Sequence, residues 1–214
     1  MRVNTRDEFG AGTGLTVTES ARRAQIIAAT IRTLAELGYQ KTSFTRIVER
    51  AGLSSTRMIS YHFGTKDDLM LATVGEIVDH QDAFLAERLG NDTDRASMLR
   101  AYITSEVAFL GAFPQEARAL WEIGTNARDA AGTPLLEHTW KAITVGRLQR
   151  QLMQGQQEGA FGTFDVEVMA LAIRQAIDGV AGKLARQPEL DLAAYGEELA
   201  RLFVRATAPD PARR

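Results

Sequence analysis

Apolar residues recur at helical spacing along most of this 214-residue chain, and no segment shows the sustained apolar–polar alternation that marks a strand. Four apolar residues share one face of the first predicted helix: Ile27, Ile31, Leu34 and Leu37. The preceding TVTE segment, Thr16–Glu19, has the pattern of a capping box, and Gly38 ends the helix. The chain is therefore predicted to be all-α.

Residues that start and end helices divide the rest of the chain. Ile47 and Val48 face inward on a short predicted helix that breaks at Gly52, and a second short helix is predicted from about Ser55 to Phe63. Glycine and proline positions then bound six longer predicted helices: 66–89, 93–112, 114–128, 134–158, 166–186 and 191–207. In the helix predicted at 134–158, Pro134 is expected at the first helical position.

The composition excludes several classes of protein. The chain has no cysteine, so it can form neither a disulfide framework nor a thiolate metal site, which suits a reducing cytoplasm. No segment approaches the roughly 20 apolar residues of a membrane span. The first residues lack the apolar core of a secretion signal. We therefore expect a cytoplasmic protein with no membrane partner.

The sequence offers no assembled catalytic site. It has no glycine-rich phosphate loop after a strand and no Gly-x-Ser-x-Gly motif. His80 lies near Asp79 and Asp82, but a chain with three histidines and no cysteine offers few other metal ligands. His138 is interpreted as a helix-surface or pocket residue. We expect no enzymatic activity, no cofactor and no metal.

The formal net charge of −2 conceals an uneven distribution. Residues 19–66 carry eight Lys or Arg and three Glu, a formal charge of +5, whereas residues 67–214 carry −7. A basic segment joined to an acidic body indicates a head that binds a polyanion, although a solvated basic helix face is the simpler alternative.

Residues 51–69, AGLSSTRMISYHFGTKDDL, combine small, hydroxylated and basic side chains with a helical apolar pattern. Two short helices joined by a tight turn containing glycine form a helix-turn-helix, whose second helix reads base edges in the major groove. Met58, Ile59 and Phe63 are predicted to face the core. Five residues offer the short polar groups and the long cation that base contacts need: Ser55, Thr56, Arg57, Ser60 and Tyr61.

The segment GYQKTSFTRIVERAGLSSTRMISYHFGTKDDL, residues 38–69, resembles the DNA-binding head of the TetR family of bacterial transcriptional regulators. The matching residues are Gly38-Tyr39, Thr42-Ser43, Ile47, Ala51-Gly52-Leu53-Ser54, His62-Phe63, Lys66 and Leu69. The segment departs from the family pattern in being one residue longer between Ser54 and Ile59. The resemblance implies a homodimer, a small-molecule effector and, usually, repression.

The resemblance also suggests roles for individual residues. Three hydroxyl residues resemble the family's phosphate contacts, and at least one of them can instead be an N-cap: Thr42, Ser43 and Thr45. Arg46 resembles a backbone or base contact. Tyr61 and His62 resemble phosphate contacts, with a packed neutral histidine as the alternative for His62. Lys66 resembles a phosphate anchor, because its ammonium and the N–H groups of a helix start favour the same anion.

The predicted effector pocket rests on aromatic and polar residues that share helix faces. Aromatic walls would give contact area to a largely apolar ligand and polar groups would orient it, whereas plain core packing is the alternative. The eight residues assigned to this pocket are Glu106, Phe109, Phe113, Trp121, Asn126, Arg128, Trp140 and Gln175. The last two predicted helices are rich in small residues and resemble the family's four-helix dimer seam, although they could equally pack within one subunit.

The sequence thus predicts a flexible arm at 1–15, a helix-turn-helix DNA-binding domain at 16–65, and a helical effector-binding and dimerisation domain at 66–214. The predicted function is a ligand-responsive regulator of transcription that binds a double-stranded operator and, as a repressor, is released by a small molecule. Ligand would change the spacing of two recognition helices, which must lie about 34–36 Å apart. The alternative is a helical adaptor whose basic head binds an acidic protein.

Overall fold

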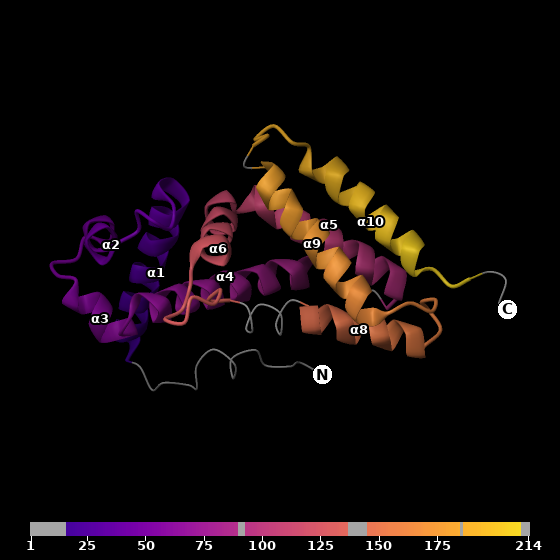
Figure 1. Ribbon diagram of the computed structural model, residues 1–214, viewed down its shortest axis with the longest axis horizontal. Helices are drawn as coiled ribbons and strands as arrows, with labels where there is room; N and C mark the ends of the chain where they lie inside the picture. The colour runs from indigo at the N-terminus through magenta and orange to yellow at the C-terminus, as the bar shows by residue number, and fades with distance from the viewer. Residues whose placement is uncertain (1–15, 90–92, 137–144, 185, 211–214) are drawn as a thin grey trace. The chain divides into compact units, whose positions relative to one another are not determined.

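The computed structural model describes residues 16–89, 93–136, 145–184 and 186–210. Within these residues the secondary structure is helical, apart from one isolated bridge between Arg128 and Pro134 (Figure 1). The helices run as follows: α1 Val17–Leu37, α2 Phe44–Ala51, α3 Arg57–Phe63, α4 Lys66–Leu89, α5 Arg95–Ala112, α6 Pro114–Asn126, α8 Gly146–Gln157, α9 Val166–Leu184 and α10 Leu192–Thr207. The predicted all-α fold is confirmed.

The chain forms two compact units. The first unit comprises the described residues up to His80 together with Arg118–Leu135, and the second comprises those of Gln81–Ala117 and Leu136–Arg214. Helices α4 and α6 each run from one unit into the other. No helix in the described part of the chain combines the length and the apolarity needed to cross a membrane.

Helix α1 begins and ends where its sequence predicts. The Thr16 hydroxyl accepts the N–H of Glu19, and the Glu19 carboxylate accepts the N–H of Thr16 at 2.8 Å, which completes the capping box. At the other end, Gly38 has φ of 76°, a backbone conformation that side chains disfavour. The helix is therefore fixed at both ends by local sequence.

The core of the first unit is built from apolar faces of α1 to α4. Ile26 and Leu34 of α1, Ile47 of α2 and Ile59 of α3 are fully buried.

The residues predicted to face this core are mostly buried. Val48 and Phe63 are buried, as predicted, while Met58 is half-buried. The predicted inward face of α1 is confirmed at Ile27 and Leu34, but Leu37 is exposed, because it is the last residue of the helix. This core leaves the opposite faces of α2 and α3 available for binding.

Two predicted helix starts need correction. Helix α3 starts at Arg57, two residues after the expected Ser55. Pro134 does not start a helix: it pairs with Arg128 in the isolated bridge, and the helix predicted at 134–158 is observed only as α8 from Gly146. Residues 137–144 of that prediction lie outside the described residues. A proline fits both a helix start and an extended segment, so local sequence did not distinguish them.

The second unit packs α10 and α9 beside α5 (Figure 1). One buried cluster joins residues from α4, α5, α8, α9 and α10. Its members include Leu85, Leu99, Tyr102, Ile103, Leu148, Leu152, Ile173, Ile177 and Ala200. A smaller cluster contains Val107, Leu110, Ala117 and Val180. The second unit therefore has its own apolar core.

Candidate nucleic-acid interface

Helices α2 and α3 are joined by the tight turn that the sequence predicts. Gly52 caps α2 in the left-handed conformation, with φ of 65°, and its N–H bonds to the carbonyl oxygens of Glu49 and Val48. Helix α3 then buries Ile59 and Phe63. A short helix with one buried face thus follows a tight turn, which is the geometry of a helix-turn-helix.

The opposite face of α3 is exposed at Arg57, Ser60 and Tyr61. Among the residues that the structure describes, Arg57 forms no ion pair, so its guanidinium is available to a ligand. Ser55 and Thr56 lie just before the helix, and the Ser55 hydroxyl accepts the N–H of Arg57 at 3.2 Å. The predicted base-reading residues therefore gather at the start of α3 and along its solvent face.

Tyr61 and His62 follow on the last turn of α3. Tyr61 is 74% exposed, and its hydroxyl lies 3.4 Å from a carboxylate oxygen of Glu19. Its ring meets the His62 ring edge-on, with centroids 5.0 Å apart. His62 is half-buried, and burial and then the nearby Arg23 guanidinium lower the pKa of its imidazole below the ordinary value. The neutral imidazole is therefore favoured in the free protein.

The predicted phosphate contacts at the start of α2 differ in exposure. Ser43 is exposed and caps α2, accepting the N–H of Arg46 at 3.4 Å, and Thr45 is also exposed. Arg46 is exposed, with one guanidinium N–H donated to the Lys41 carbonyl at 2.9 Å. Thr42 is only 2% exposed, and its hydroxyl donates to the Gly38 carbonyl at 2.8 Å. Thr42 thus serves the turn before α2, while Ser43, Thr45 and Arg46 face solvent.

Lys66 is the first residue of α4 and lies against Tyr39. Its ammonium is 4.1 Å from the centroid of the Tyr39 ring and 3.5 Å from the Tyr39 carbonyl oxygen. Burial lowers the pKa of this ammonium. The cation is therefore held at a helix start by an aromatic face, with N–H donors still available for an anion beside the helix N-terminus.

Sequence reasoning missed Arg23, which fixes the end of α3. Its guanidinium donates to the His62 carbonyl and lies 4.2 Å from the centroid of the Phe63 ring. A cation near the last carbonyls of a helix satisfies acceptors that have no partner within that helix. Because Arg23 is on α1 and lies 39 residues from His62 in sequence, no local pattern could have revealed the contact.

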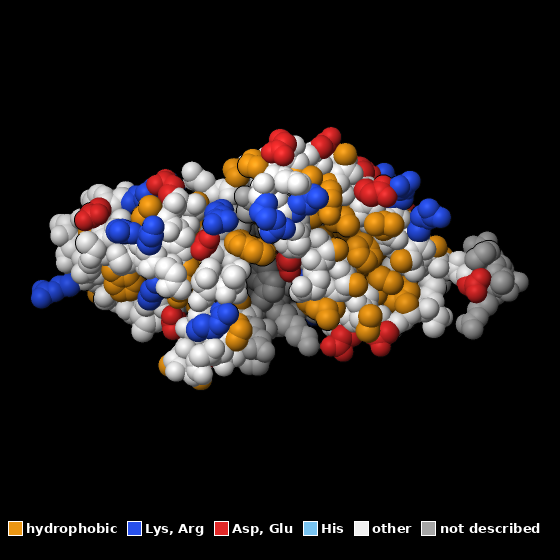
Figure 2. Space-filling model, turned by 45° about the horizontal axis from the view of Figure 1, so that its top comes forward, with side chains coloured by type: hydrophobic (Ala, Val, Ile, Leu, Met, Phe, Trp, Pro, Cys, Tyr) orange, Lys and Arg blue, Asp and Glu red, His pale blue; other side chains and the backbone are white. Residues whose placement is uncertain are grey.

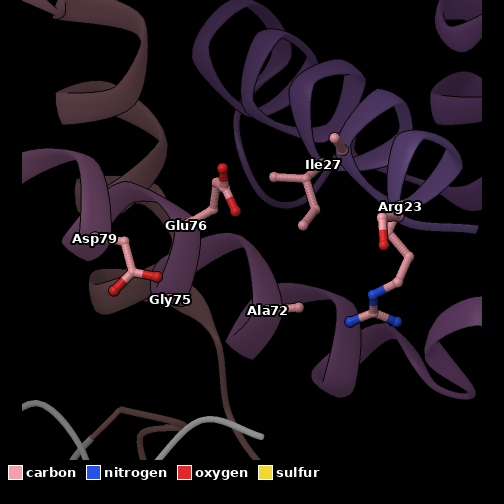
Figure 3. A pocket seen from close by; sticks show the side chains of 8 residues that line it. Arg23, Ile27, Ala72, Gly75, Glu76 and Asp79 are labelled. Atoms are coloured by element: carbon pink, nitrogen blue, oxygen red, sulfur yellow. The ribbon is translucent and has the colours of Figure 1, made fainter. Parts of the chain in front are cut away.

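Arg23 also lines a groove of about 270 Å³ between α1 and α4, which is open to solvent. Figure 3 shows Arg23 toward one end and Asp79 and Glu76 toward the other, with Ile27 between them. The two carboxylates are exposed, and Arg23 is engaged with α3. The groove is therefore a shallow surface feature between helices of the binding head.

The residues predicted for an effector pocket fall into both compact units. Trp121, Asn126 and Arg128 belong to the first unit, where Trp121 and Arg128 are exposed. Asn126 is half-buried, and its amide donates to the Glu122 carboxylate at 3.3 Å. Trp140 lies outside the described residues.

The other predicted pocket residues belong to the second unit. Phe109 and Phe113 pack with each other and with Phe84, which was not among the predicted pocket residues, at centroid distances of 5.0 to 5.7 Å. Glu106 is buried on the same helix, α5, whereas Gln175 is exposed on α9. The structure therefore packs Phe109 against Phe113, while Glu106 is paired elsewhere on the same helix and Gln175 faces solvent.

Glu106 finds its partners within the chain. Its carboxylate accepts from Arg174 at 2.7 Å and from the Gln81 amide at 3.0 Å, and Arg174 is 5% exposed. Arg174 also bonds the carboxylate of Asp178, one turn along α9. No local pattern indicates this ion pair, because Glu106 and Arg174 lie 68 residues apart.

Comparison with known proteins agrees with the helix-turn-helix geometry. Residues 26–73, which cover α1, α2, α3 and the start of α4, match the family described as bacterial regulatory proteins, tetR family. The helix-turn-helix head of the chain therefore matches the TetR family. The resemblance of residues 38–69 is thereby confirmed, and the adaptor alternative is not favoured.

The curated relatives match the N-terminal part of the chain. The regulator BetI of Burkholderia cenocepacia (strain HI2424) is 36% identical over 85 residues, which cover 39% of this chain and 43% of BetI. BetI 2 of Chromohalobacter salexigens is 41% identical over 81 residues, covering 36% of this chain and 39% of the relative. The chain thus spans less than half the length of the curated relatives it matches.

A solved structure matches over most of the chain. The regulator FadR from Bacillus subtilis, solved in complex with stearoyl-CoA, superposes with a TM-score of 0.74 at 20% identity, covering 85% of this chain and 97% of FadR. At this identity the match concerns the fold alone. The helical body beyond the head therefore shares the fold of this regulator.

Proposed function

We propose that this protein is a DNA-binding transcriptional regulator that responds to a small molecule and acts, as a repressor, on a double-stranded operator. The proposal rests mainly on the solvent face of α3, the helix that follows the tight turn at Gly52. Arg57, Ser60 and Tyr61 are exposed on this face. Arg57 can donate in a fork to a guanine edge, while Ser60 and Tyr61 offer hydroxyls to bases or phosphates. A bacterial operator lies in the cytoplasm, so we propose that location and a non-catalytic role.

Residues around α3 would supply the phosphate contacts. Ser43, Thr45 and Arg46 lie exposed at the start of α2, and Lys66 lies at the start of α4. Their groups suit phosphate oxygens, which position a protein on DNA without reading its sequence. We propose that residues 16–65 bind DNA, with Lys66 at the boundary, and that residues 66–214 bind the effector and dimerise.

We propose that α9 and α10 form the dimer seam. Val168 and Leu171 of α9 and Leu202 of α10 are exposed apolar residues, and Gly179 is exposed on α9. Figure 2 shows hydrophobic side chains gathered over the part of the molecule that holds the C-terminal helices. Contiguous exposed apolar surface commonly marks an interface, and a two-fold dimer would present two recognition helices to a two-fold operator. Gly182 is buried within its own unit, so Gly179 is the better probe of this seam.

We propose a largely apolar effector for the second unit. Phe84, Phe109 and Phe113 form an aromatic cluster, and α5 also carries the buried Glu106 that pairs with Arg174. FadR from Bacillus subtilis was solved with stearoyl-CoA, so long-chain acyl compounds are a reasonable first set of probes. Binding would shift the population away from the DNA-competent spacing of about 34–36 Å between recognition helices.

A mobility-shift experiment with genomic fragments tests the proposed function. Purified protein should retain a small subset of fragments in the presence of excess random duplex, and the retained fraction should fall as salt rises, because phosphate contacts release counterions. Equal retention of all fragments would mean that the protein binds DNA without sequence specificity. No retention at low salt would remove DNA as the partner.

A further inference from the structure

Glu122 of α6 carries a buried carboxylate that holds the turn between α1 and α2. The residue is 8% exposed, and one carboxylate oxygen accepts the backbone N–H of Tyr39 at 2.9 Å. The same oxygen accepts the Asn126 amide at 3.3 Å, and the other oxygen pairs with Arg118 at 2.7 Å. Both oxygens are therefore used, and the contact with Tyr39 joins residues 83 positions apart.

Gly38, the residue before Tyr39, leaves room for the Glu122 carboxylate. Its φ is 76°, a backbone conformation that residues with a Cβ rarely adopt. A Cβ at this position would also lie 3.2 Å from a carboxylate oxygen of Glu122. The glycine thus lets the chain turn and lets the carboxylate approach the next amide closely. A charged acceptor on a backbone N–H is stronger than a neutral one, so Glu122 is a firm anchor for Tyr39.

Tyr39 in turn contacts Lys66 and the start of α2. Its ring and carbonyl oxygen hold the Lys66 ammonium, at 4.1 Å from the centroid and 3.5 Å from the oxygen. The same carbonyl accepts the N–H of Thr42 at 3.1 Å, and Ser43, the N-cap of α2, follows directly. One bond from Glu122 therefore fixes the residue against which two proposed phosphate contacts are placed.

We propose that Glu122 is a positioning residue for DNA binding. Its carboxylate holds the Tyr39 amide, and through Tyr39 it sets the position of the Lys66 ammonium and of the exposed Ser43 at the start of α2. This inference rests on the proposed function, because it assigns Glu122 a role in presenting phosphate contacts. This role is indirect, because the Glu122 carboxylate is buried, and the loss of a buried carboxylate would otherwise be expected only to lower stability.

The test combines amide exchange with the salt dependence of DNA binding. Glu122→Ala should make the Tyr39 amide exchange at least about tenfold faster than in the wild type, because its acceptor is gone. The same variant should lower the slope of log affinity against log salt by about one, since Lys66 loses its fixed position, and should leave the preferred sequence unchanged. Glu122→Gln keeps an oxygen for the Tyr39 amide and should restore both readouts.

Two further variants separate positioning from general charge and stability effects. Glu158→Ala removes one exposed carboxylate at the end of α8 and should keep the wild-type slope, although it changes the net charge equally. In a Lys66→Ala background, Glu122→Ala should change the slope no further, because both act on the same contact. If Glu122→Ala does not fold, Glu122→Asp draws the carboxylate back by one methylene and should still lower the slope.

The outcomes distinguish this inference from the proposed function. If the wild type binds DNA and a folded Glu122→Ala variant, or Glu122→Asp in its place, keeps the wild-type slope, then the inference is wrong and the proposed function stands. Full additivity with Lys66→Ala would also overturn it. If the wild type binds no DNA while its Tyr39 amide is protected, the contact exists but the proposed function fails, and this role for Glu122 fails with it.

Discussion

Polar side chains on α3 face solvent, whereas those at the centre of the second unit are buried and paired with one another. Arg57 and Ser60 lie exposed, with no ion pair at Arg57 among the described residues. Arg174 and Glu106, by contrast, are both less than 7% exposed and bond each other at 2.7 Å. A surface that binds a polyanion must keep its donors available, whereas a helical body must satisfy its own charges internally. An arginine is therefore available for binding on α3, whereas in the second unit an arginine neutralises a buried carboxylate.

Breaking the buried pair should have the largest effect on stability. Arg174→Ala leaves the buried Glu106 carboxylate without its cation and should cost about 3–5 kcal/mol of unfolding free energy. Arg100, half-exposed and paired with Glu197, gives the matched control, and Arg100→Ala should cost less than about 1 kcal/mol. Chemical denaturation measures both. Equal costs would mean that burial does not distinguish these arginines.

Disrupting the proposed seam should separate the two subunits. The wild type should sediment at twice its chain mass of 23.5 kDa at micromolar concentration. Gly179 is exposed, and a Cβ there would meet no atom within 4 Å, so Gly179→Glu should give a monomer without disturbing its own unit. Gly124 of α6 is equally open, and Gly124→Glu should remain a dimer. A dimeric Gly179→Glu variant would place the seam elsewhere.

Removing the exposed cation on α3 should change specificity. Arg57→Ala should cost about 1–3 kcal/mol at one operator position and relax the preference there. Arg57→Lys keeps the charge but loses the forked donor geometry, so it should also relax that position. Affinities for a set of single-position operator variants provide the measurement. A uniform loss for Arg57→Ala, rescued by Arg57→Lys, would show a phosphate contact instead.

The smallest expected effect concerns His62, where stability and affinity should respond to pH in opposite directions. Burial lowers the pKa of His62 in the folded chain, so below about pH 6.5 the unfolded chain binds more protons and stability falls as pH falls. A DNA phosphate at His62 would raise that pKa, so DNA affinity should increase over the same range. His62→Gln should lose both dependences. An affinity that does not change between pH 7.5 and 5.5 would leave His62 as a packing residue.

Local sequence predicted the fold of the head better than that of the body. Capping at Thr16 and Glu19 and the glycine at position 38 fix α1 at both ends, and the predicted bounds of α4 at 66 and 89 are confirmed. Pro134 shows the limit, since a proline fits a helix start and an extended segment equally well. Caps are signals within a few residues, so they are readable without a structure.

In the candidate site too, local features were predictable from the sequence and long-range contacts were not. Exposure of Arg57, Ser60 and Tyr61 follows from the period of one short helix, so it was predictable. The anchoring of Tyr39 by Glu122, and of α3 by Arg23, joins segments 83 and 39 residues apart. Such contacts depend on how helices pack and leave no periodic trace in the sequence. The burial of Thr42 was not predicted for the same reason.

Selection of bound sites from random duplex DNA tests most directly whether the exposed face of α3 reads sequence. We expect the purified wild-type protein to enrich a two-fold symmetric sequence whose half-sites are separated by about 10–10.5 base pairs or a multiple of that spacing, as two recognition helices in one dimer require. The enriched sites should lose their preference at one symmetric position when Arg57→Ala is used in the selection. Recovery of unrelated sequences after repeated rounds, or of the same consensus with Arg57→Ala, would contradict the account.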